Sequence, residues 1–235
     1  MPKGAEPFGT VRDRAVYLPD ADTLVAADLH LGKVAASPVN APVPAGADMI
    51  DRLEDLLDLF HPAEVVLAGD VLHTYGFVPR AARESLAALT DCVMAAGATV
   101  TAVEGNHDTQ LNAVTDLATT ESHELSEGTI VSHGHEAPEI EAPRFVIGHD
   151  HPTIEIEGRR RACYLQASTI YDGADVLALP AFNPAVRGTL VNGLVDGDPL
   201  SPFLADLSQF QPVVWDEGTG EPVVFPPLET LRPFL

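Results

Sequence analysis

The sequence from 99 to 108 reads Thr99-Val100-Thr101-Ala102-Val103-Glu104-Gly105-Asn106-His107-Asp108, and the fold can be predicted outward from this stretch. Its first five residues form a β-branched, apolar run that is typical of a strand, and a turn that starts with glycine follows. The turn offers a neutral amide ligand, Asn106, beside an imidazole, His107, that can carry a proton. We therefore expect a strand that brings polar side chains to one edge of a sheet.

Two earlier segments follow the same plan. The apolar runs 23–27 and 64–68 end at Asp28 and at Gly69-Asp70, and such continuous runs are typical of strands buried on both faces. Apolar residues at helical spacing predict a helix over 47–60, and Pro79 starts a second predicted helix that extends to about residue 96. Strands that alternate with helices predict βαβ units, in which ligands collect at the carboxyl ends of the strands.

The second half of the chain has few helical patterns. Its short apolar segments predict a second, mixed or antiparallel sheet that faces the first, with strands at 129–132, 144–147, 153–157, 161–165, 176–179 and 189–191. We also expect a loose lead-in to about residue 12, a short strand at 15–18 and a proline-rich loop at 37–44. The tail from about residue 211 is expected to be irregular apart from one strand near Val213, within a single domain over 1–235.

Composition limits the class of protein. With 235 residues, 46% of them hydrophobic, the chain can bury the core of one substantial globular domain. No apolar run approaches the length of a membrane span, no signal pattern opens the chain, and Cys92 and Cys163 do not suggest a disulfide framework. We therefore expect a cytoplasmic protein without a membrane partner.

The net charge of -22 is unusual for a protein that handles nucleic acid. Lys3 and Lys33 are the only lysines, and the acidic residues are spread along the chain rather than gathered in a tail. Molar salt limits electrostatic repulsion to about 3 Å, so an acidic surface that is poor in lysine suits a high-salt cytoplasm. We interpret the charge as the mark of a halophilic archaeon.

Polar motifs recur in a fixed order along the chain. They are Asp28-Leu29-His30, Gly69-Asp70, the turn at 105–108, Ser132-His133-Gly134-His135 and Gly148-His149-Asp150-His151. Asp and His without Cys favour borderline-hard divalent ions, and a carboxylate can bridge two ions roughly 3.5–4 Å apart. Asp70 is the candidate bridge. The order of these motifs resembles the calcineurin-like metallophosphoesterase superfamily.

The resemblance implies both a fold and a site. The fold would be α/β, with two facing mixed β-sheets flanked by helices. One metal ion would be held by Asp28, His30, Asp70 and His151, and the other by Asp70, Asn106, His133 and His149. His133 is preferred to His135 because the histidine of the superfamily precedes glycine directly after a strand. Two divalent ions are expected, Mn²⁺ first, with Fe²⁺, Zn²⁺ or Ni²⁺ as alternatives.

Such a centre predicts a mechanism. A metal-bridging hydroxide would attack the phosphorus in line, while the cations neutralise the charge that builds in the transition state. By the resemblance, His107 is not a ligand and lies over the leaving group. There, oriented by Asp108, it would protonate the departing oxygen.

The stretch Gly69-Asp70-Val71-Leu72-His73 resembles the Gly-Asp-x-x-His form of SbcD-type nucleases, in which the last histidine positions the phosphate diester. The motifs together are similar to the archaeal SbcD-related phosphoesterases and to the bacterial ligase-associated DNA-damage-response endonucleases. That resemblance implies a small DNA-repair nuclease that acts on nucleic acid, with a helicase or a ligase as partner. A small nucleotide diester as substrate, and a non-catalytic scaffold with the same fold, are the alternatives.

Three further side chains are candidate substrate contacts. Arg160 belongs to the basic cluster 159–161, which is expected in a turn and can contact phosphate through forked hydrogen bonds. Asn183 and Arg187 follow a proline-flanked loop that would line the cleft.

Overall fold

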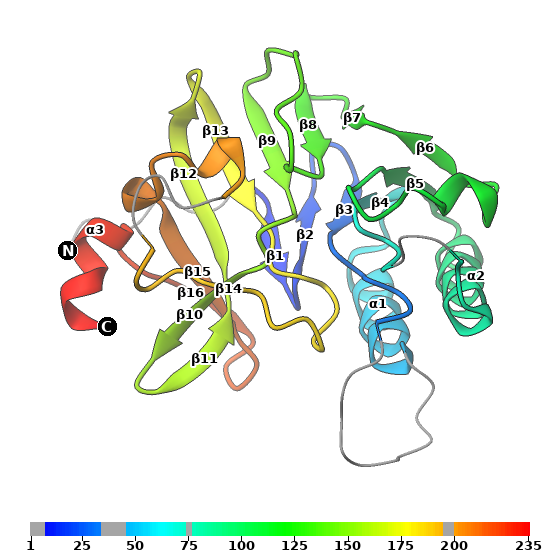
Figure 1. Ribbon diagram of the computed structural model, residues 1–235, viewed down its shortest axis with the longest axis horizontal. Coiled ribbons are helices and arrows are strands. Elements are labelled where there is room, and N and C mark those ends of the chain that lie inside the picture. Colours follow the sequence, from blue (N-terminus) through cyan, green and yellow to red (C-terminus); the bar gives the residue numbers. More distant parts are fainter. Residues whose placement is uncertain (1–7, 34–45, 74–76, 195–199) are drawn as a thin grey trace.

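The computed structural model describes residues 8–33, 46–73, 77–194 and 200–235 (Figure 1). The predicted proline-rich loop at 37–44 lies outside the described residues, as does the lead-in up to residue 7. In the described part of the chain, no helix combines the length and the apolar character needed to cross a lipid bilayer.

The first half of the chain builds a six-stranded sheet in the order β1-β2-β3-β4-β5-β6. The strands are β1 Thr10–Arg12, β2 Ala15–Leu18, β3 Thr23–Ala26, β4 Glu64–Ala68, β5 Thr99–Val103 and β6 Ala118–Thr120. From β3 to β6 the pairing is parallel, whereas β2 is antiparallel to both of its neighbours. The carboxyl ends of the parallel strands therefore meet at one edge, as the sequence predicted.

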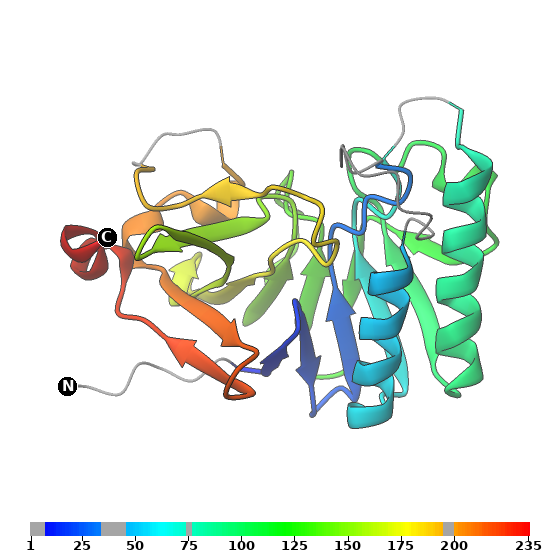
Figure 2. The same ribbon diagram turned by 90° about the horizontal axis from the view of Figure 1, so that it is seen from below.

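Two helices, α1 Ala47–Phe60 and α2 Arg80–Ala95, pack side by side on the outer face of this sheet (Figures 1 and 2). Both predicted helices are confirmed. Leu53, Leu56 and Leu86 from their apolar faces join residues of the strands in one buried cluster. Pro79 lies just before α2, where its missing amide hydrogen removes no helical bond.

The second half forms a seven-stranded sheet in the order β16-β15-β12-β13-β9-β8-β7 and a small sheet in the order β11-β10-β14. In the large sheet β9 runs parallel to β8 and β13, and the other pairs are antiparallel. The strands are β7 Ser122–Glu124, β8 Thr129–Ser132, β9 Arg144–Ile147, β10 Pro152–Ile156, β11 Arg159–Ala162, β12 Tyr164–Tyr171, β13 Ala174–Ala178, β14 Thr189–Leu190, β15 Gln211–Asp216 and β16 Glu221–Val224.

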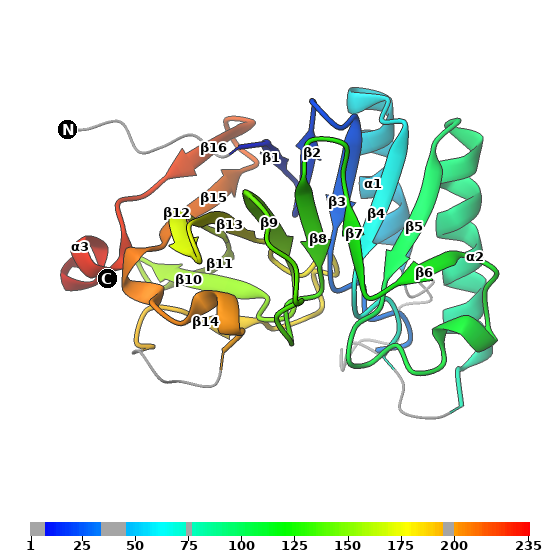
Figure 3. The same cartoon turned by 90° about the horizontal axis from the view of Figure 1, so that it is seen from above.

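The two large sheets face each other across a shared core. Val25 and Val66 of the first sheet lie in one buried cluster with Val131, Val146 and Leu177 of the second. Figure 3 shows how β6 and β7 carry the chain from one sheet to the other. The small sheet, short helical turns and α3 Leu228–Leu231 cover the outer face of the second sheet. The predicted α/β fold, with two facing mixed β-sheets flanked by helices, is confirmed.

Three expectations differ from the structure. The predicted strand 161–165 is the end of β11 and the start of β12, because the chain changes sheets at Cys163. The tail from about residue 211 is not irregular, since β15 and β16 form a hairpin of which only the strand near Val213 was expected. The last residues of the predicted lead-in form β1.

Candidate metal centre

The predicted metal ligands lie on loops that follow β3, β4, β5, β8 and β9. Backbone hydrogen bonds join the first two loops: the amide of Asp28 donates to the carbonyl of Gly69 at 3.1 Å, and the amide of His30 donates to that of Asp70 at 2.8 Å. The amide of His149 donates to Asp28 Oδ2 at 3.0 Å, which attaches a loop of the second sheet to a loop of the first. Both sheets thus contribute residues to one edge of the sandwich.

Four of the predicted ligands form a first group. Asp28, His30, Asp70 and His151 each offer one ligand atom, and these atoms all lie within 4.8 Å of one another. His151 Nε2 is 3.0 Å from Asp28 Oδ1 and 3.2 Å from His30 Nε2. The structure therefore brings together the set expected for the first metal ion.

A second group surrounds His133. Its Nε2 atom is 3.1 Å from Asn106 Oδ1, 3.2 Å from His149 Nδ1 and 3.5 Å from Asp70 Oδ1. Its Nδ1 atom lies 3.3 Å from the carbonyl of Ala68, and a proton on Nδ1 leaves the Nε2 lone pair facing the group. The alternative ligand, His135, lies farther from the group, with its ring centroid 5.2 Å from that of His133 and 6.1 Å from that of His149. His133 is the better placed of the two, because its Nε2 atom lies within 3.5 Å of the other three side chains.

Asp70 lies between the two groups. Its Oδ2 atom is 3.8 Å from His30 Nε2 in the first group, and its Oδ1 atom is 3.5 Å from His133 Nε2 in the second. The side chain is buried, with 3% of its surface exposed. One carboxylate therefore presents one oxygen to each group, which is the geometry that a bridging ligand needs.

Left-handed backbone conformations are concentrated at these ligands. Positive φ angles occur at Asp28 (59°), His30 (45°), Asp70 (48°), His149 (72°) and His151 (45°), which are five of the seven predicted ligands. Residues other than glycine adopt this conformation uncommonly, and each such residue costs about 1–3 kcal/mol. Other residues with positive φ lie elsewhere in the described chain, but five of them meet at this edge, and such clusters of strain are typical of functional sites.

Burial decides which ligands carry charge. It lowers the pKa of His30 and of His133 to about 2 and that of His149 to about 4, so these imidazoles are neutral at pH 7. Burial also raises the pKa of Asp28, and it raises the pKa of Asp70 to about 7. Burial is the largest single influence on His151 and lowers its pKa, but the carboxylates of Asp28, Asp70 and Asp150 together outweigh it, so the pKa is raised. Neutral imidazoles among buried carboxylates fit divalent cations, which would replace the lost solvation.

His107 and His73 lie beside the ligands but outside both groups. Their rings stack with centroids 5.2 Å apart, and both stand edge-on to the ring of His30. The backbone amide of His107 donates to Asp70 Oδ1 at 2.9 Å, and its Nε2 atom is 3.8 Å from Asp70 Oδ2. Burial, and then the neighbouring His73, lower the pKa of His107. An imidazole is thus held over the shared carboxylate, where it can reach a group bound between the two ligand sets.

The sequence profile of calcineurin-like phosphoesterases matches residues 22–150, which is more than half of the chain and includes every predicted ligand except His151. The chain belongs to the calcineurin-like phosphoesterase family. It is a metal-dependent phosphoesterase. Among curated protein sequences, none matches this phosphoesterase significantly.

Two solved structures are similar to this phosphoesterase. The crystal structure of Pseudomonas putida nuclease MPE has a TM-score of 0.63 and 22% identity, over 91% of this chain and 92% of that chain. This likeness shows a common fold. Yfce, a phosphoesterase from E. coli, has a TM-score of 0.41 and 15% identity over 83% of this chain and 88% of that chain, too weak a likeness to define the fold further.

Asp108 of this phosphoesterase holds together the loops that follow β4 and β5, which are two of the loops that carry predicted metal ligands (the metal loops). Its carboxylate accepts hydrogen bonds from the amides of Val71, Leu72 and Gly105 at 3.1, 2.8 and 2.9 Å. The loops approach so closely that a Cβ atom on Gly105 would collide with the Asp70 backbone. The sequence predicted Asp108 as the group that orients His107, and the structure adds this bracing role.

Asn183, a predicted substrate contact, points into the protein instead. The side chain is 6% exposed, its Nδ2 atom donates to the carbonyl of Leu29 at 2.9 Å, and its Oδ1 atom accepts from the amide of Ala185 at 2.9 Å. Both ends of the amide are thus used by the backbone, and the Nδ2 end attaches Asn183 to the loop that carries Asp28 and His30. Asn183 is therefore better described as a positioning residue than as a substrate contact.

Replacing Asn183 by Ala is expected to lower kcat about 10- to 100-fold, because support of metal ligands has effects of that size. The unpaired carbonyl of Leu29 should also cost about 1–3 kcal/mol of folding free energy, or roughly 2–10 °C in Tm. Asn192→Ala is the matched control, since Asn192 makes the same pair of backbone bonds to Glu155 away from the metal loops. Equal kcat in the two variants would remove the positioning role of Asn183.

The two candidate arginines differ in their surroundings. Arg187 is exposed, next to Gly188, which packs against the backbone of His151. Arg160 lies on β11 and not in the predicted turn, because the turn is formed by Glu157 and Gly158, both with positive φ. Its guanidinium donates to Thr153 Oγ1 at 2.8 Å and to the carbonyl of Gly188 at 2.6 Å. Arg160 thus attaches β11 to the segment that carries Arg187.

Sequence reasoning missed Asp150 as a supporting residue. Its side chain is buried, its Oδ2 atom accepts from the amide of Ser201 at 3.1 Å, and Ser201 Oγ donates to the carbonyl of Gly134 at 2.5 Å. A segment far along the chain therefore fixes the loops of His133 and His151. The only sequence signal for this role is the position of Asp150 between two ligand histidines.

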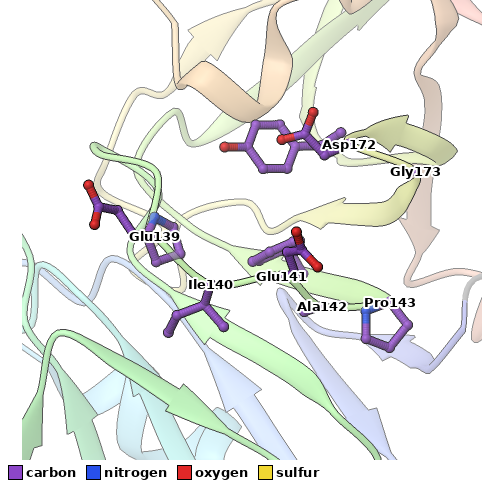
Figure 4. A pocket seen from close by; sticks show the side chains of 10 residues that line it. Glu139, Ile140, Glu141, Ala142, Pro143, Asp172 and Gly173 are labelled. Atoms are coloured by element: carbon purple, nitrogen blue, oxygen red, sulfur yellow. The ribbon is translucent and has the colours of Figure 1, made fainter.

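Two cavities are lined by carboxylates and, among the residues that the structure describes, by no lysine or arginine. One of about 880 Å³ has Glu139, Glu141 and Asp172 around Phe145 and Tyr171, and it includes none of the predicted site residues (Figure 4). Another, of about 690 Å³, is lined by Gly105, His133 and His135 and by Glu104, Glu121, Glu136 and Glu139. We call this second cavity the acidic groove. Its carboxylates repel a phosphate on the His133 side of the centre.

Proposed function

We propose that this chain is a dinuclear-metal phosphodiesterase, most specifically a small nuclease related to DNA repair, and that it folds as one domain. The observation that carries the proposal is the division of the Asp70 oxygens between two groups of ligands. Mn²⁺ is the proposed metal, because imidazole and carboxylate donors together suit it, and Fe²⁺, Zn²⁺ and Ni²⁺ are the alternatives. The proposed ligands are Asp28, His30, Asp70, Asn106, His133, His149 and His151.

The proposed mechanism assigns a task to each neighbouring side chain. Divalent cations held by the proposed ligands would neutralise the phosphate oxygens and would lower the pKa of water, which is the chemistry that supplies hydroxide near neutral pH. His107 donates a proton to the leaving oxygen, and Asp108 fixes the turn that carries His107. Burial and His73 lower the pKa of His107, and the negative charge of a bound diester would act in the opposite direction.

The proposed diester specificity rests on His73. It ends a Gly-Asp-x-x-His motif, its Nδ1 atom is 3.2 Å from His30 Nδ1, and its ring stacks on His107. It is therefore placed to orient a phosphate that lies between the ligands and the leaving group. The fold is shared with a nuclease, which agrees with a nucleic acid substrate. A helicase or a ligase as partner, and a cytoplasmic location, are proposed from the family resemblance and from composition.

Hydrolysis of a small nucleotide diester is the second candidate function. The observation in its favour is the acidic groove, which disfavours a long polyanion on the side of His133. A small diester needs only the space between the ligand groups and His107.

A panel of substrates tests the proposal. The Mn²⁺-loaded protein in molar KCl is given an aryl phosphodiester, the matching monoester, and end-labelled single- and double-stranded DNA. Cleavage of the diester and of DNA, with little cleavage of the monoester, is the expected result. Cleavage of the aryl diester while both DNA substrates stay intact would favour a small nucleotide diester as the substrate. Cleavage of neither the diester nor DNA would contradict the proposed phosphodiesterase activity.

The acidic surface predicts that stability depends on salt. The chain has 35 acidic residues and only 13 basic ones, and screening in molar KCl reduces the repulsion among the carboxylates. The charges are closer together in the folded state than in the unfolded chain, so screening stabilises the folded state more. We expect Tm to rise by on the order of 10 °C between low salt and molar KCl. Melting followed by circular dichroism measures this, with sucrose at equal osmolality as the uncharged control. The same Tm at both KCl concentrations would contradict the proposed halophilic origin.

A further inference from the structure

Four arginines gather in one pocket of a strongly acidic protein. The pocket has a volume of about 360 Å³ and is lined by Arg14 from the β1–β2 turn, Arg52 from α1, and Arg160 and Arg161 from β11. We call it the arginine pocket. The whole chain has 13 Lys and Arg residues, so nearly a third of its basic side chains meet here.

Three carboxylates line the same pocket, and two of them are engaged elsewhere. Asp13 is paired with Arg12 at 3.3 Å, and Asp216 Oδ1 accepts the amide of Gly218 at 3.0 Å. Glu217 is exposed on the β15–β16 turn. Within residues 8–33, 46–73, 77–194 and 200–235, no carboxylate lies within ion-pair distance of the four arginines. The four guanidinium groups outnumber the three carboxylates, and Glu217 is the smallest of the influences on the pKa of Arg14, so the pocket keeps a net positive charge that attracts an anion.

Three of the four guanidinium groups are held in place by hydrogen bonds to backbone carbonyls. Arg14 donates to the carbonyl of Ala181 at 2.9 Å, and Arg52 donates to that of Phe182 at 3.1 Å. Arg14 and Arg52 line the same pocket, and burial, and then the charge of Arg52, lower the pKa of Arg14. Arg161 is exposed on β11. Three of the four arginines are thus positioned before a ligand arrives, so binding orders mainly the Arg161 side chain.

One segment of chain connects the arginine pocket with the metal centre. The segment 181–189 receives the hydrogen bonds from Arg14, Arg52 and Arg160. The same segment bonds to the metal loops, since the amide of Phe182 donates to the carbonyl of Ala27 at 2.8 Å and the amide of Thr189 to that of His151 at 3.0 Å. Arginines therefore lie on the His151 side of the centre, and the acidic groove lies on the His133 side.

We propose that the arginine pocket binds a phosphate of the polynucleotide strand beyond the scissile bond. The strand then leaves the metal centre toward β11 and away from the acidic groove. Arginine suits this task because its planar fork gives two parallel hydrogen bonds to phosphate oxygens. This proposal rests on the proposed nuclease function, and it also defines a binding site that can be tested without turnover.

Arg161→Gln tests the proposal by selectivity. The Mn²⁺-loaded protein is assayed with an end-labelled oligonucleotide and with bis(p-nitrophenyl) phosphate, which lacks a second phosphate. We expect the ratio of kcat/KM for the oligonucleotide to kcat/KM for the small diester to fall about tenfold. Arg159→Gln is the matched control, because Arg159 is exposed on the same strand and does not line the pocket. Equal ratios in the two variants would overturn the proposal.

Binding in the presence of EDTA separates this proposal from the proposed function. Fluorescence anisotropy of a labelled, uncleaved oligonucleotide should give a Kd that rises about tenfold in Arg161→Gln and stays unchanged in Arg159→Gln, whether or not the protein hydrolyses DNA. Inorganic phosphate in the millimolar range is the competing probe. If it binds at the pocket while the oligonucleotide does not, a free anion is the ligand and the assignment to a strand is overturned.

Discussion

Asp70→Asn is expected to lower kcat on a phosphodiester by about 10³ or more, because loss of metal-derived charge stabilisation costs several kcal/mol. Asn keeps the shape of the side chain and one oxygen, which can still accept the amide of His107. It cannot offer a charged oxygen to both groups of ligands at once. Steady-state hydrolysis of an aryl phosphodiester at saturating Mn²⁺ measures the effect.

Asp175→Asn is the control for the replacement of a carboxylate by an amide. Asp175 also accepts a backbone amide, from Thr169 at 3.0 Å, but it lies on β13 away from the predicted ligands. This variant should keep the wild-type kcat, and both variants should keep near-native circular dichroism. A kcat for Asp70→Asn within a few-fold of the control would show that Asp70 does not bridge.

His107→Ala is the second large effect expected. The leaving oxygen of a nucleotide is poorly stabilised as an anion, so loss of the proton donor should lower kcat on DNA by about 10²–10⁴. A p-nitrophenolate leaving group needs little protonation, so its kcat should fall roughly tenfold or less by the same Brønsted argument. Metal binding should be spared, since His107 belongs to neither group of ligands.

The comparison of leaving groups makes the His107 prediction specific. His61→Ala is the control, because His61 is an exposed histidine at the far end of α1, before β4 begins. A loss of equal size on DNA and on the p-nitrophenyl ester would assign His107 to binding or folding, and would contradict its role as a proton donor.

The positions of the metal ligands could be predicted because parallel strands end at one edge. The buried runs before Asp28, Asp70 and Asn106 fix three loops at that edge from local pattern alone. The order of the motifs then added His133, His149 and His151 through the resemblance. What the pattern does not carry is the left-handed backbone at five of these ligands, because φ depends on how the loops bond to one another.

The strands that the sequence did not predict share one property. β1, β6, β7 and β16 are the outermost strands of the two large sheets. Edge strands bury little surface, so they carry short, polar stretches such as Ala118–Thr120 and Ser122–Glu124 instead of continuous apolar runs. Pattern reasoning therefore finds the centre of each sheet and misses its borders.

The roles of Asn183 and Arg14 were also beyond local pattern. Each makes its decisive hydrogen bond to a residue more than 150 positions away, Leu29 and Ala181 respectively. Polar residues after a proline-flanked loop look equally suited to a substrate or to the backbone. Only the tertiary contacts distinguish the two uses.

The number of metal ions bound per chain tests the central claim most directly. After equilibrium dialysis against Mn²⁺, elemental analysis should give two ions for the wild-type protein. His151→Ala and His133→Ala should each lose one ion, from the first and the second group respectively, while His61→Ala keeps both. A single ion in the wild-type protein, or one ion lost from the same site in both histidine variants, would contradict a dinuclear centre bridged by Asp70.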